Sequence, residues 1–363
     1  MATVAELVGA MESIAPTRLA AEWDNVGLLV GDPGQAVAHL MLAIDCTRPV
    51  LQEARDRGCD AIVAYHPPIF APQKRFVAGS IAFEAARAGL AIYTPHTALD
   101  VAEGGTNDVL ANALWMTARA ALRSALPRDP ELKLVTFVPE SHVEAVGQAV
   151  FAAGAGRIGK YSSCSFRAAG TGTFFGEQGA SPVVGQAGKL EAAPEVRLET
   201  VVPAGRVEAV VWALRAAHPY EEPAFDLVRL AATPGNRGFG CVGAVGPASV
   251  AALVDRVKRA LDVEHVLLAG PTDREVTRAA VCAGSGAELV PDAIATGATL
   301  LLTGELRHHD ALRAVDAGLA VVCTRHSTSE RAALVGLERR LVALLPGVTV
   351  SRSREDRDPF VFA

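Results

Sequence analysis

The sequence predicts an α/β protein in which mainly parallel sheets, flanked by helices, form an outer domain that an inserted α+β domain interrupts. Three short apolar runs follow helical segments and end in histidine: GCDAIVAYH, GLAIYTPH and GLAVVCTRH. This alternation is typical of βαβ units and a parallel sheet. Between the second and third runs, a strand, a Val-Pro pair and a helix occur twice, at Val138-Pro139 and Val202-Pro203. This repeat suggests a pseudo-duplicated domain of ferredoxin-like type.

Composition limits the class of protein. The chain has 363 residues, half of them hydrophobic and 20% charged, which favours a globular protein of two domains. A formal net charge of −6 gives no basic footprint for nucleic acid. No apolar run is long enough to span a bilayer, and the N-terminus lacks the pattern of a signal peptide. Six scattered cysteines without a C-x-x-C pair favour buried free thiols, so we expect a cytoplasmic protein.

The elements of the outer domain follow from local patterns. A first helix is predicted at residues 3–14, and another at 49–59, with proline in its first turn and Gly58 at its end. The other elements predicted before residue 128 are strands at 26–30, 40–46, 61–64 and 91–94, and helices near 80–89 and 107–115.

Two breaks in the pattern define the predicted domains. The segments LPRDP (126–130) and TPGNRGFG (233–240) are typical of linkers. We therefore expect residues 1–127 and 237–363 to form one discontinuous domain and residues 128–236 to be inserted into it.

The C-terminal part predicts a helix at 251–261 and strands near 277–282, 300–305 and 320–323. The last strand runs directly into His326, and an amphipathic helix through Leu334 follows. Ser327, Thr328 or Ser329 is the expected N-cap of that helix.

Titratable side chains follow these strands. Because ligands bind beyond the carboxyl ends of strands in open α/β sheets, we expect the side chains to meet at one sheet edge. A mixed set of His, Asp and Glu without Cys suits Zn, Mn, Fe or Co, and the number of candidates suggests two divalent metal ions. A histidine before a helix can equally be a surface residue or a cap. The candidates are His66, His96, Asp100, Glu305, His308, His309, His326 and Glu330.

Four sequence blocks carry a resemblance to a known family. YHPPIF, PHTALD, HSTSE and EWDNVGLLVGD resemble the signature blocks of the NIF-three-like dinuclear metal centre proteins, also called GTP cyclohydrolase I type 2 homologues. The resemblance covers nearly the whole chain. The middle section, with HPYEEPAFDL, is similar to the PII/CutA-like insert of longer bacterial members.

The resemblance implies roles for individual residues. It implies that His66, Asp100, His326 and Glu330 are metal ligands, and that His96, in the same block as Asp100, is a further ligand or a water partner. For a hydrolase, His96 or Glu330 is the expected proton carrier. Tyr65 stands where the family usually has a further histidine ligand. Since a phenol is a poor ligand near neutral pH, Tyr65 is expected to donate a hydrogen bond near the metal or to pack behind the ligands. Asp24 and His309 are further candidates for residues that lie behind the ligands and support them. In the insert, His218 is expected to have a role in a turn and an interface.

Two functions follow as hypotheses. The first is a metal-dependent hydrolase in which two metal ions activate a water for attack on a nucleotide or related small molecule. The family name implies GTP as substrate, but no P-loop motif selects a nucleotide independently. The alternative is a non-enzymatic metal-binding or regulatory protein whose insert acts in assembly or sensing. The resemblance also implies a homohexamer, a dimer of trimers.

Overall fold

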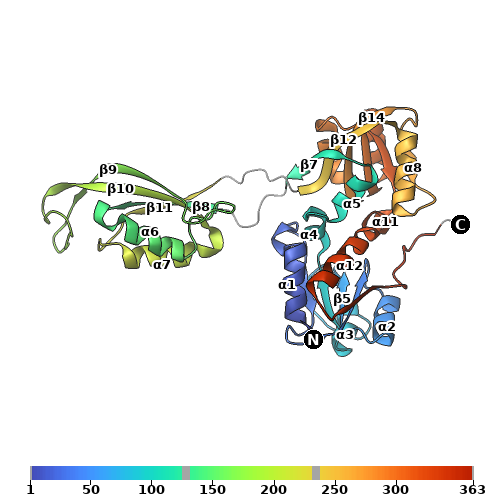
Figure 1. The fold of residues 1–363 in the computed structure, drawn as a ribbon, viewed down its shortest axis with the longest axis horizontal. Helices are drawn as coiled ribbons and strands as arrows, with labels where there is room; N and C mark the ends of the chain where they lie inside the picture. The colour runs from blue at the N-terminus through green and yellow to red at the C-terminus, as the bar shows by residue number, and fades with distance from the viewer. Residues whose placement is uncertain (1, 125–130, 231–237, 362–363) are drawn as a thin grey trace. The chain divides into compact units, whose positions relative to one another are not determined.

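The computed structural model describes residues 2–124, 131–230 and 238–361 (Figure 1). The chain divides into two compact units, Met1–Leu126 with Pro234–Ala363, and Pro127–Thr233. The predicted domain boundaries, at 127/128 and 236/237, lie outside the described residues, so the assignment of an inserted domain stays a prediction.

A five-stranded sheet forms one half of the first unit. Its strand order is β17-β4-β5-β6-β2, and the first four strands run parallel while β2 is antiparallel to β6. The bounds are β17 (Thr349–Arg352), β4 (His39–Ala43), β5 (Ala61–Ala64), β6 (Ala91–Thr94) and β2 (Gly27–Val30). A two-stranded ribbon of β1 (Ala2–Thr3) and β3 (Ala36–Val37) accompanies it.

Both faces of this sheet are buried by helices. Leu40 and Leu42 of β4 belong to the core with α1 (Val4–Ile14) and α12 (Ala333–Leu344). Met41 and Ala43 point to the other face, against α2 (Arg48–Asp56), with α3 (Ile81–Arg87) in the same core. Burial on both faces explains why β4, β5 and β6 are continuous apolar runs rather than alternating ones.

A six-stranded sheet forms the other half, in the order β13-β16-β15-β14-β12-β7. The central strands β14, β15 and β16 are parallel, and the outer strands pair antiparallel. Helices α5 and α8 share the core on one face, and α9 and α10 that on the other. The bounds are β13 (Leu267–Ala269), β16 (Ala320–Cys323), β15 (Leu300–Glu305), β14 (Glu275–Ser285), β12 (Gly238–Ser249), β7 (Thr117–Ser124), α5 (Thr106–Ala113), α8 (Val250–Leu261), α9 (Val290–Ala295) and α10 (His308–Asp316).

The α/β class is therefore confirmed, but one prediction about the sheets is wrong. The strands that precede His66 and His96 are β5 and β6 of the five-stranded sheet, whereas the strand that precedes His326 is β16 of the six-stranded sheet. Local alternation of helix and strand carries no information on which strands pair. The three histidines thus come from the carboxyl ends of two sheets rather than one.

Two short helices start at these strand ends, α4 (His96–Val101) and α11 (His326–Arg331). The predicted N-cap of α11 was wrong, because the helix begins at His326 itself, after Arg325 with φ of 77°. Ser327 and Ser329 lie inside the helix and are buried. His326 and Glu330 therefore sit four residues apart on one helical turn.

The second unit has the element order β8, α6, β9, β10, α7, β11 and one antiparallel sheet, β11-β8-β10-β9. Helices α6 and α7 pack together on one face of the sheet (Figure 1), where Val146, Val150, Val210 and Leu214 meet Leu198. The bounds are β8 (Glu131–Val138), α6 (Val143–Ala152), β9 (Ser165–Phe175), β10 (Leu190–Pro203), α7 (Val207–Ala217) and β11 (Phe225–Arg229). Short 3-10 helices lie at Thr17–Leu19, Glu140–His142, Ala204–Arg206 and Ala287–Leu289.

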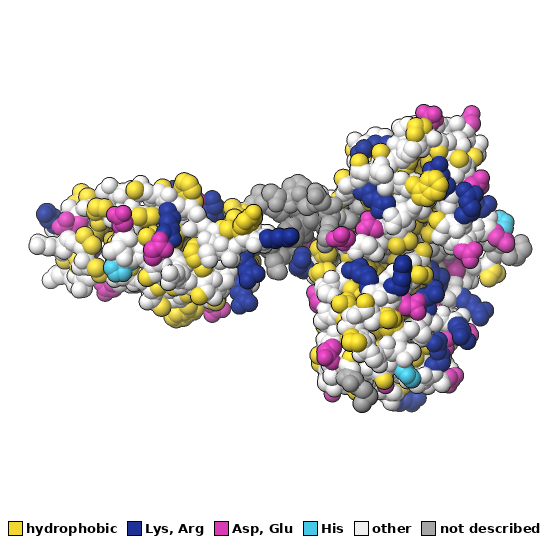
Figure 2. Space-filling view, viewed as in Figure 1, with side chains coloured by type: hydrophobic (Ala, Val, Ile, Leu, Met, Phe, Trp, Pro, Cys, Tyr) yellow, Lys and Arg dark blue, Asp and Glu magenta, His cyan; other side chains and the backbone are white. Residues whose placement is uncertain are grey.

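General features agree with the composition. All six cysteines are free thiols, and four of them are buried. Lys and Arg side chains are interspersed with Asp and Glu over the visible face of each unit (Figure 2). Among the described residues, no helix is both long and apolar enough to cross a bilayer.

Candidate metal centre

His66 is held at the end of the five-stranded sheet. The backbone N–H groups of Tyr65 and His66 continue the ladder beyond β5 and donate to the carbonyls of Ala43 and Ile44. The His66 Nδ1 atom donates to Asp45 Oδ1 at 2.9 Å. Asp45 follows β4, the parallel neighbour of β5, so adjacent strand ends fix the orientation of the imidazole.

His326 and Glu330 come from the six-stranded sheet. His326 Nδ1 donates to Glu305 Oε1 at 3.1 Å, and Glu305 ends the neighbouring strand β15. His326 Nε2 lies 3.3 Å from Glu330 Oε1. Ser329 anchors this turn against β14, because its hydroxyl donates to the carbonyl of His326 and accepts from the N–H of Gly284.

The two sheets bring His66, His326 and Glu330 together. One possible ligand atom of each residue lies within 4.8 Å of those of the others. His66 Nε2 and Glu330 Oε2 are 3.3 Å apart, and both atoms are buried without a hydrogen bond to the described residues. Two ligand atoms bound to one tetrahedral Zn²⁺ at about 2.1 Å are roughly 3.4 Å apart. The donor set and its spacing therefore fit a transition-metal ion.

Two glycines leave room for this group. A Cβ on Gly284, whose φ is +62°, would lie 2.8 Å from Glu330 Oε1 and 3.4 Å from His326 Nε2. A Cβ on Gly304 would lie 2.5 Å from the Gly284 carbonyl oxygen and 2.9 Å from His326 Cα. The close approach of α11 to β14 and β15 thus depends on residues without side chains.

The electrostatics of the group favour a cation. Burial lowers the pKa of His66, but the neighbouring carboxylates of Asp45 and Glu330 outweigh it and raise that pKa to about 10. Glu330 raises the pKa of His326 to about 9 against the opposing effect of burial. Burial raises the pKa of Glu330, but the two imidazoles hold it below its ordinary value. The imidazoles of His66 and His326 are therefore surrounded by three carboxylates, those of Asp45, Glu305 and Glu330.

Asp100 lies next to this group but is paired with Tyr65. The Tyr65 hydroxyl donates to Asp100 Oδ1 and is approached by the Thr106 hydroxyl at 3.4 Å. Burial raises the pKa of Asp100 to about 6, although the hydrogen bond from Tyr65 opposes this. Burial and the Asp100 charge raise the pKa of Tyr65 well above its ordinary value. Asp100 is not part of the three-residue group.

His96 is oriented in the same way as the other two histidines. Its Nδ1 atom donates to Asp24 Oδ1 at 2.7 Å, and Asp24 also accepts from the backbone N–H and hydroxyl of Thr97. The His96 ring centroid is 5.4 Å from that of His66 and 5.8 Å from that of Tyr65. The backbone φ of His96 is +31°, a strained value for a side chain with a Cβ.

The structure thus gathers most of the predicted residues. The group formed by His66, His326 and Glu330 has Tyr65, His96, Asp100 and Glu305 as its neighbours. Asp24 is connected to it through His96. His309 does not join them: it lies exposed at the start of α10, with its ring 5.2 Å from that of His308.

Asp45 is the partner that sequence reasoning missed. It lies at the end of the predicted strand 40–46, and a position at the end of a strand is the same signal that identified His66. Its role becomes visible only once β4 and β5 are known to be neighbours.

Comparison with known proteins decides the family. The family model for Duf34/NIF3 (NGG1p interacting factor 3) matches residues 2–359. The chain belongs to the NIF3 family. Solved NIF3-like structures share its fold: a Bacillus cereus protein related to NIF3 is 35% identical, with a TM-score of 0.75 over 100% of this chain and 99% of that one. A Staphylococcus aureus protein is 25% identical, with a TM-score of 0.85 over 100% and 99%.

Curated relatives of this NIF3 protein bear a common name. A Bacillus subtilis protein named GTP cyclohydrolase 1 type 2 homolog is 36% identical over 98% of each chain. A Mycobacterium leprae protein of the same name is 40% identical over 85% of this chain and 82% of its own.

Proposed function

We propose that this NIF3 protein is a metal-dependent hydrolase of a nucleotide or related small molecule. The observation that carries the proposal is a pair of buried atoms beside His326, His66 Nε2 and Glu330 Oε2, which lie 3.3 Å apart and form no hydrogen bond within the part of the chain that the structure describes. The ligands would be His66, His326 and Glu330, with Asp100 added from the family resemblance. Two divalent ions per chain, Zn or Mn, Fe or Co, are the proposed complement.

The side chains suit this chemistry. A bound ion of this kind supplies a Lewis acid that polarises the substrate and lowers the pKa of water. His96 carries a proton on Nδ1, held by Asp24, so its Nε2 atom is available to accept and return a proton. Glu330 is the alternative proton carrier. Of the two, His96 is favoured, because both Glu330 oxygens lie against the histidines.

A cavity next to these residues supports a small-molecule substrate. It has a volume of about 530 Å³, and its lining includes Asp45, His66, Glu305 and His326 together with apolar side chains such as Leu306 and Phe360. This volume lies within the range of about 300–1,000 Å³ that is typical of ligand sites. The name of the curated relatives makes GTP the first substrate to test.

The second unit is part of the proposal as well. Its element order, βαββαβ, supports an inserted ferredoxin-like domain. The role proposed for this PII/CutA-like insert is assembly or sensing. A homohexamer built as a dimer of trimers remains the proposed assembly.

Elemental analysis of protein purified without a His tag tests the metal centre. Wild type is compared with His326→Ala and with His265→Ala, whose imidazole is exposed and is not part of the group formed by His66, His326 and Glu330. We expect His326→Ala to lose most of its metal and His265→Ala to retain it. Equal metal content in all three proteins, or none after reloading, would rule out the centre.

A turnover assay then tests the enzyme. Metal-loaded wild type and His96→Ala are incubated with GTP and with other nucleotides, and products are separated by chromatography. Turnover that His96→Ala loses while it keeps its metal would support the hydrolase. Full metal occupancy without turnover of any nucleotide would favour a non-enzymatic metal-binding or regulatory protein.

A further inference from the structure

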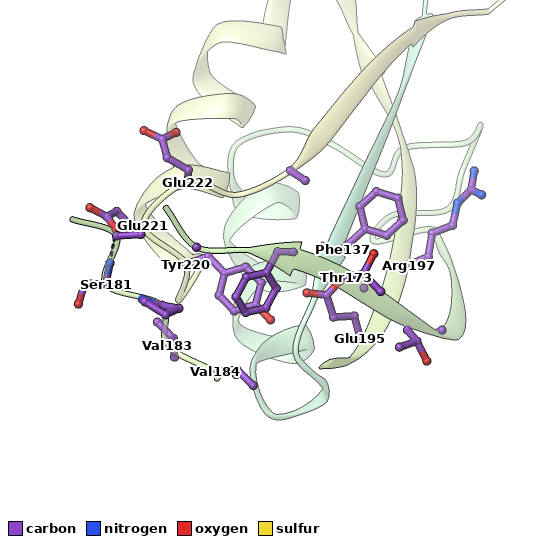
Figure 3. A pocket seen from close by; sticks show the side chains of 18 of the residues that line it. Phe137, Thr173, Ser181, Val183, Val184, Glu195, Arg197, Tyr220, Glu221 and Glu222 are labelled. Atoms are coloured by element: carbon purple, nitrogen blue, oxygen red, sulfur yellow. Dashed lines mark hydrogen bonds between the residues drawn. The ribbon is translucent and has the colours of Figure 1, made fainter. Parts of the chain in front are cut away.

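A cavity of about 550 Å³ lies within the second unit, and all of its lining residues belong to that unit (Figure 3). Strand β9 and the segment after it, at 180–184, form two of its walls. Glu195 and Arg197 of β10 and the turn at 220–222 complete it. The N–H of Ser181 donates to Glu221 Oε2 at 3.3 Å, which connects the segment to the turn (Figure 3). These contacts enclose a volume suited to a small ligand.

Small residues keep the cavity open. The part of β9 that lines it is rich in alanine and glycine, in the run AAGTGT from Ala168 to Thr173. A Cβ on Gly172 would lie only 2.1 Å from Glu195 Oε2, so the glycine provides the space that the carboxylate occupies. The wall is therefore shaped around the Glu195 carboxylate rather than filled by side chains.

A buried histidine fixes two aromatic walls. The side chain of His218 donates from Nε2 to the carbonyl of Phe137 at 3.0 Å and accepts at Nδ1 from the N–H of Tyr220 at 3.1 Å. These two bonds require the neutral imidazole, and burial lowers the pKa of His218 accordingly. The HPYEEP motif thus has a structural meaning: its histidine places Phe137 and Tyr220 at the cavity.

The charged side chains that line the cavity are predominantly acidic. Glu195, Glu221 and Glu222 line it, and the one lining cation, Arg197, pairs with Glu199 at 2.7 Å. The Glu195 carboxylate forms no ion pair with a described residue. Tyr220 and Glu195 point toward each other (Figure 3), and the Tyr220 hydroxyl is buried without a hydrogen bond of ordinary geometry to any described residue. Burial, followed by the Glu195 carboxylate, raises the pKa of Tyr220 to about 12.

We propose that this cavity binds a small organic cation, an ammonium group carried on an apolar or aromatic body. The Glu195 carboxylate would accept hydrogen bonds from the ammonium group, and the Tyr220 ring and hydroxyl would lie beside it. Phe137, Phe174 and Val183 supply the apolar surface for the body of the ligand. A carboxylate next to aromatic faces is the arrangement that favours a cation over a neutral or anionic ligand.

Calorimetric titration of the full chain near neutral pH tests the proposal. The probes are 2-phenylethylamine and its neutral counterpart 2-phenylethanol. We expect the ammonium ion to bind at least about tenfold more tightly, as a hydrogen bond to a charged group allows. Glu195→Gln should remove this preference and leave binding of the alcohol unchanged. Glu208→Gln, an equal change of charge at an exposed position of α7, should bind both probes as wild type does.

A second variant keeps the test decisive if Glu195→Gln does not fold, as judged by circular dichroism. Tyr220→Phe should weaken binding of 2-phenylethylamine several-fold with little effect on 2-phenylethanol. Equal affinity for the two probes would overturn the proposal. So would a loss of ammonium binding in Glu208→Gln as large as that in Glu195→Gln, because surface charge alone would then explain it. Failure of the metal centre would leave this result unaffected, since the cavity shares no residue with it.

Discussion

The three histidines of the candidate centre share one device at the scale of single residues. Each donates from Nδ1 to a carboxylate: His66 to Asp45, His96 to Asp24 and His326 to Glu305. In the neutral imidazole, this bond fixes the proton on Nδ1 and leaves the Nε2 lone pair to bind a metal ion, as is common for metal-bound histidine. The carboxylates come from positions far from their histidines in the sequence, so strand pairing and loop packing create the pairs.

Gly284→Ala should remove metal without unfolding the protein. The new Cβ would lie 2.8 Å from Glu330 Oε1 and force the carboxylate to move. The left-handed backbone, at φ +62°, adds a cost of about 1 kcal/mol in the free energy of unfolding. Gly347→Ala is the matched control, because Gly347 has φ of +87° and nothing within 4 Å of its added Cβ. Urea unfolding of both variants measures the cost of backbone strain, and metal analysis of both variants measures the loss of the site. Comparable metal content in the two would contradict the prediction.

Tyr65→His should increase the amount of metal held per chain. In wild type the Tyr65 hydroxyl donates to Asp100, which occupies one carboxylate oxygen with a group that is a poor ligand. An imidazole at this position would add a ligand and release Asp100.

The measurement is elemental analysis at increasing metal concentration. Tyr65→Phe is the control, because it releases Asp100 without adding a ligand. An unchanged metal content in Tyr65→His would show that the phenol does not limit the second ion.

At the scale of elements, much of the fold could be predicted from local pattern. The apolar run AIVA predicts β5 at its observed bounds, and Pro49 and Gly58 bracket α2. What local pattern could not give is the partner of each strand. The runs before His96 and His326 look alike in sequence, yet β6 and β16 belong to different sheets. His66 and His326 could be predicted as candidates because each follows an apolar strand in the sequence. Asp45 could not be recognised as the partner of His66, because that requires knowing that β4 and β5 are neighbours.

One carboxylate of α2 binds the start of the segment that follows β17. Glu53 accepts from the Ser353 hydroxyl and from the backbone N–H groups of Arg354 and Glu355. Burial raises the pKa of Glu53, but these bonds outweigh it and lower the pKa to about 2. Because the pKa of the folded state lies below the ordinary value, the stabilisation is complete above the pKa of the unfolded state and is lost as pH falls toward about 2.

Glu53→Gln should therefore destabilise the protein most near neutral pH. The difference in unfolding free energy between wild type and variant should shrink between about pH 5 and pH 2, where Glu53 becomes protonated. Urea unfolding at several pH values measures it. Glu264→Gln, at a side chain that is 93% exposed, should show little difference at any pH. A Glu53→Gln difference that stays constant with pH would contradict the assignment.

At the scale of the whole molecule, each unit contains its own core. Residues such as Leu134, Val150, Leu198 and Leu214 pack only within the second unit. The candidate metal-binding group, His66, His326 and Glu330, lies within the first unit. Cores of this kind allow parts of a chain to fold independently.

Replacement of residues 128–236 by a short Gly-Ser linker should leave the metal centre intact. The shortened chain is expected to bind as much metal as wild type by elemental analysis, and residues 127–233 expressed alone should unfold cooperatively. Sedimentation of the shortened chain also tests the proposed hexamer, which should dissociate to a smaller assembly. Loss of metal in the shortened chain would show that the two units depend on each other.

The position of the centre between two sheets has a consequence for the lifetime of the protein. His66 belongs to one sheet, and His326 and Glu330 to the other, so an ion bound by all three would cross-link the halves of the first unit. An ion present at about a hundred times its Kd would add about 2.7 kcal/mol to the free energy of unfolding. A cell short of this metal would then hold more unfolded chain and degrade it faster, so that abundance of the protein would follow the metal supply.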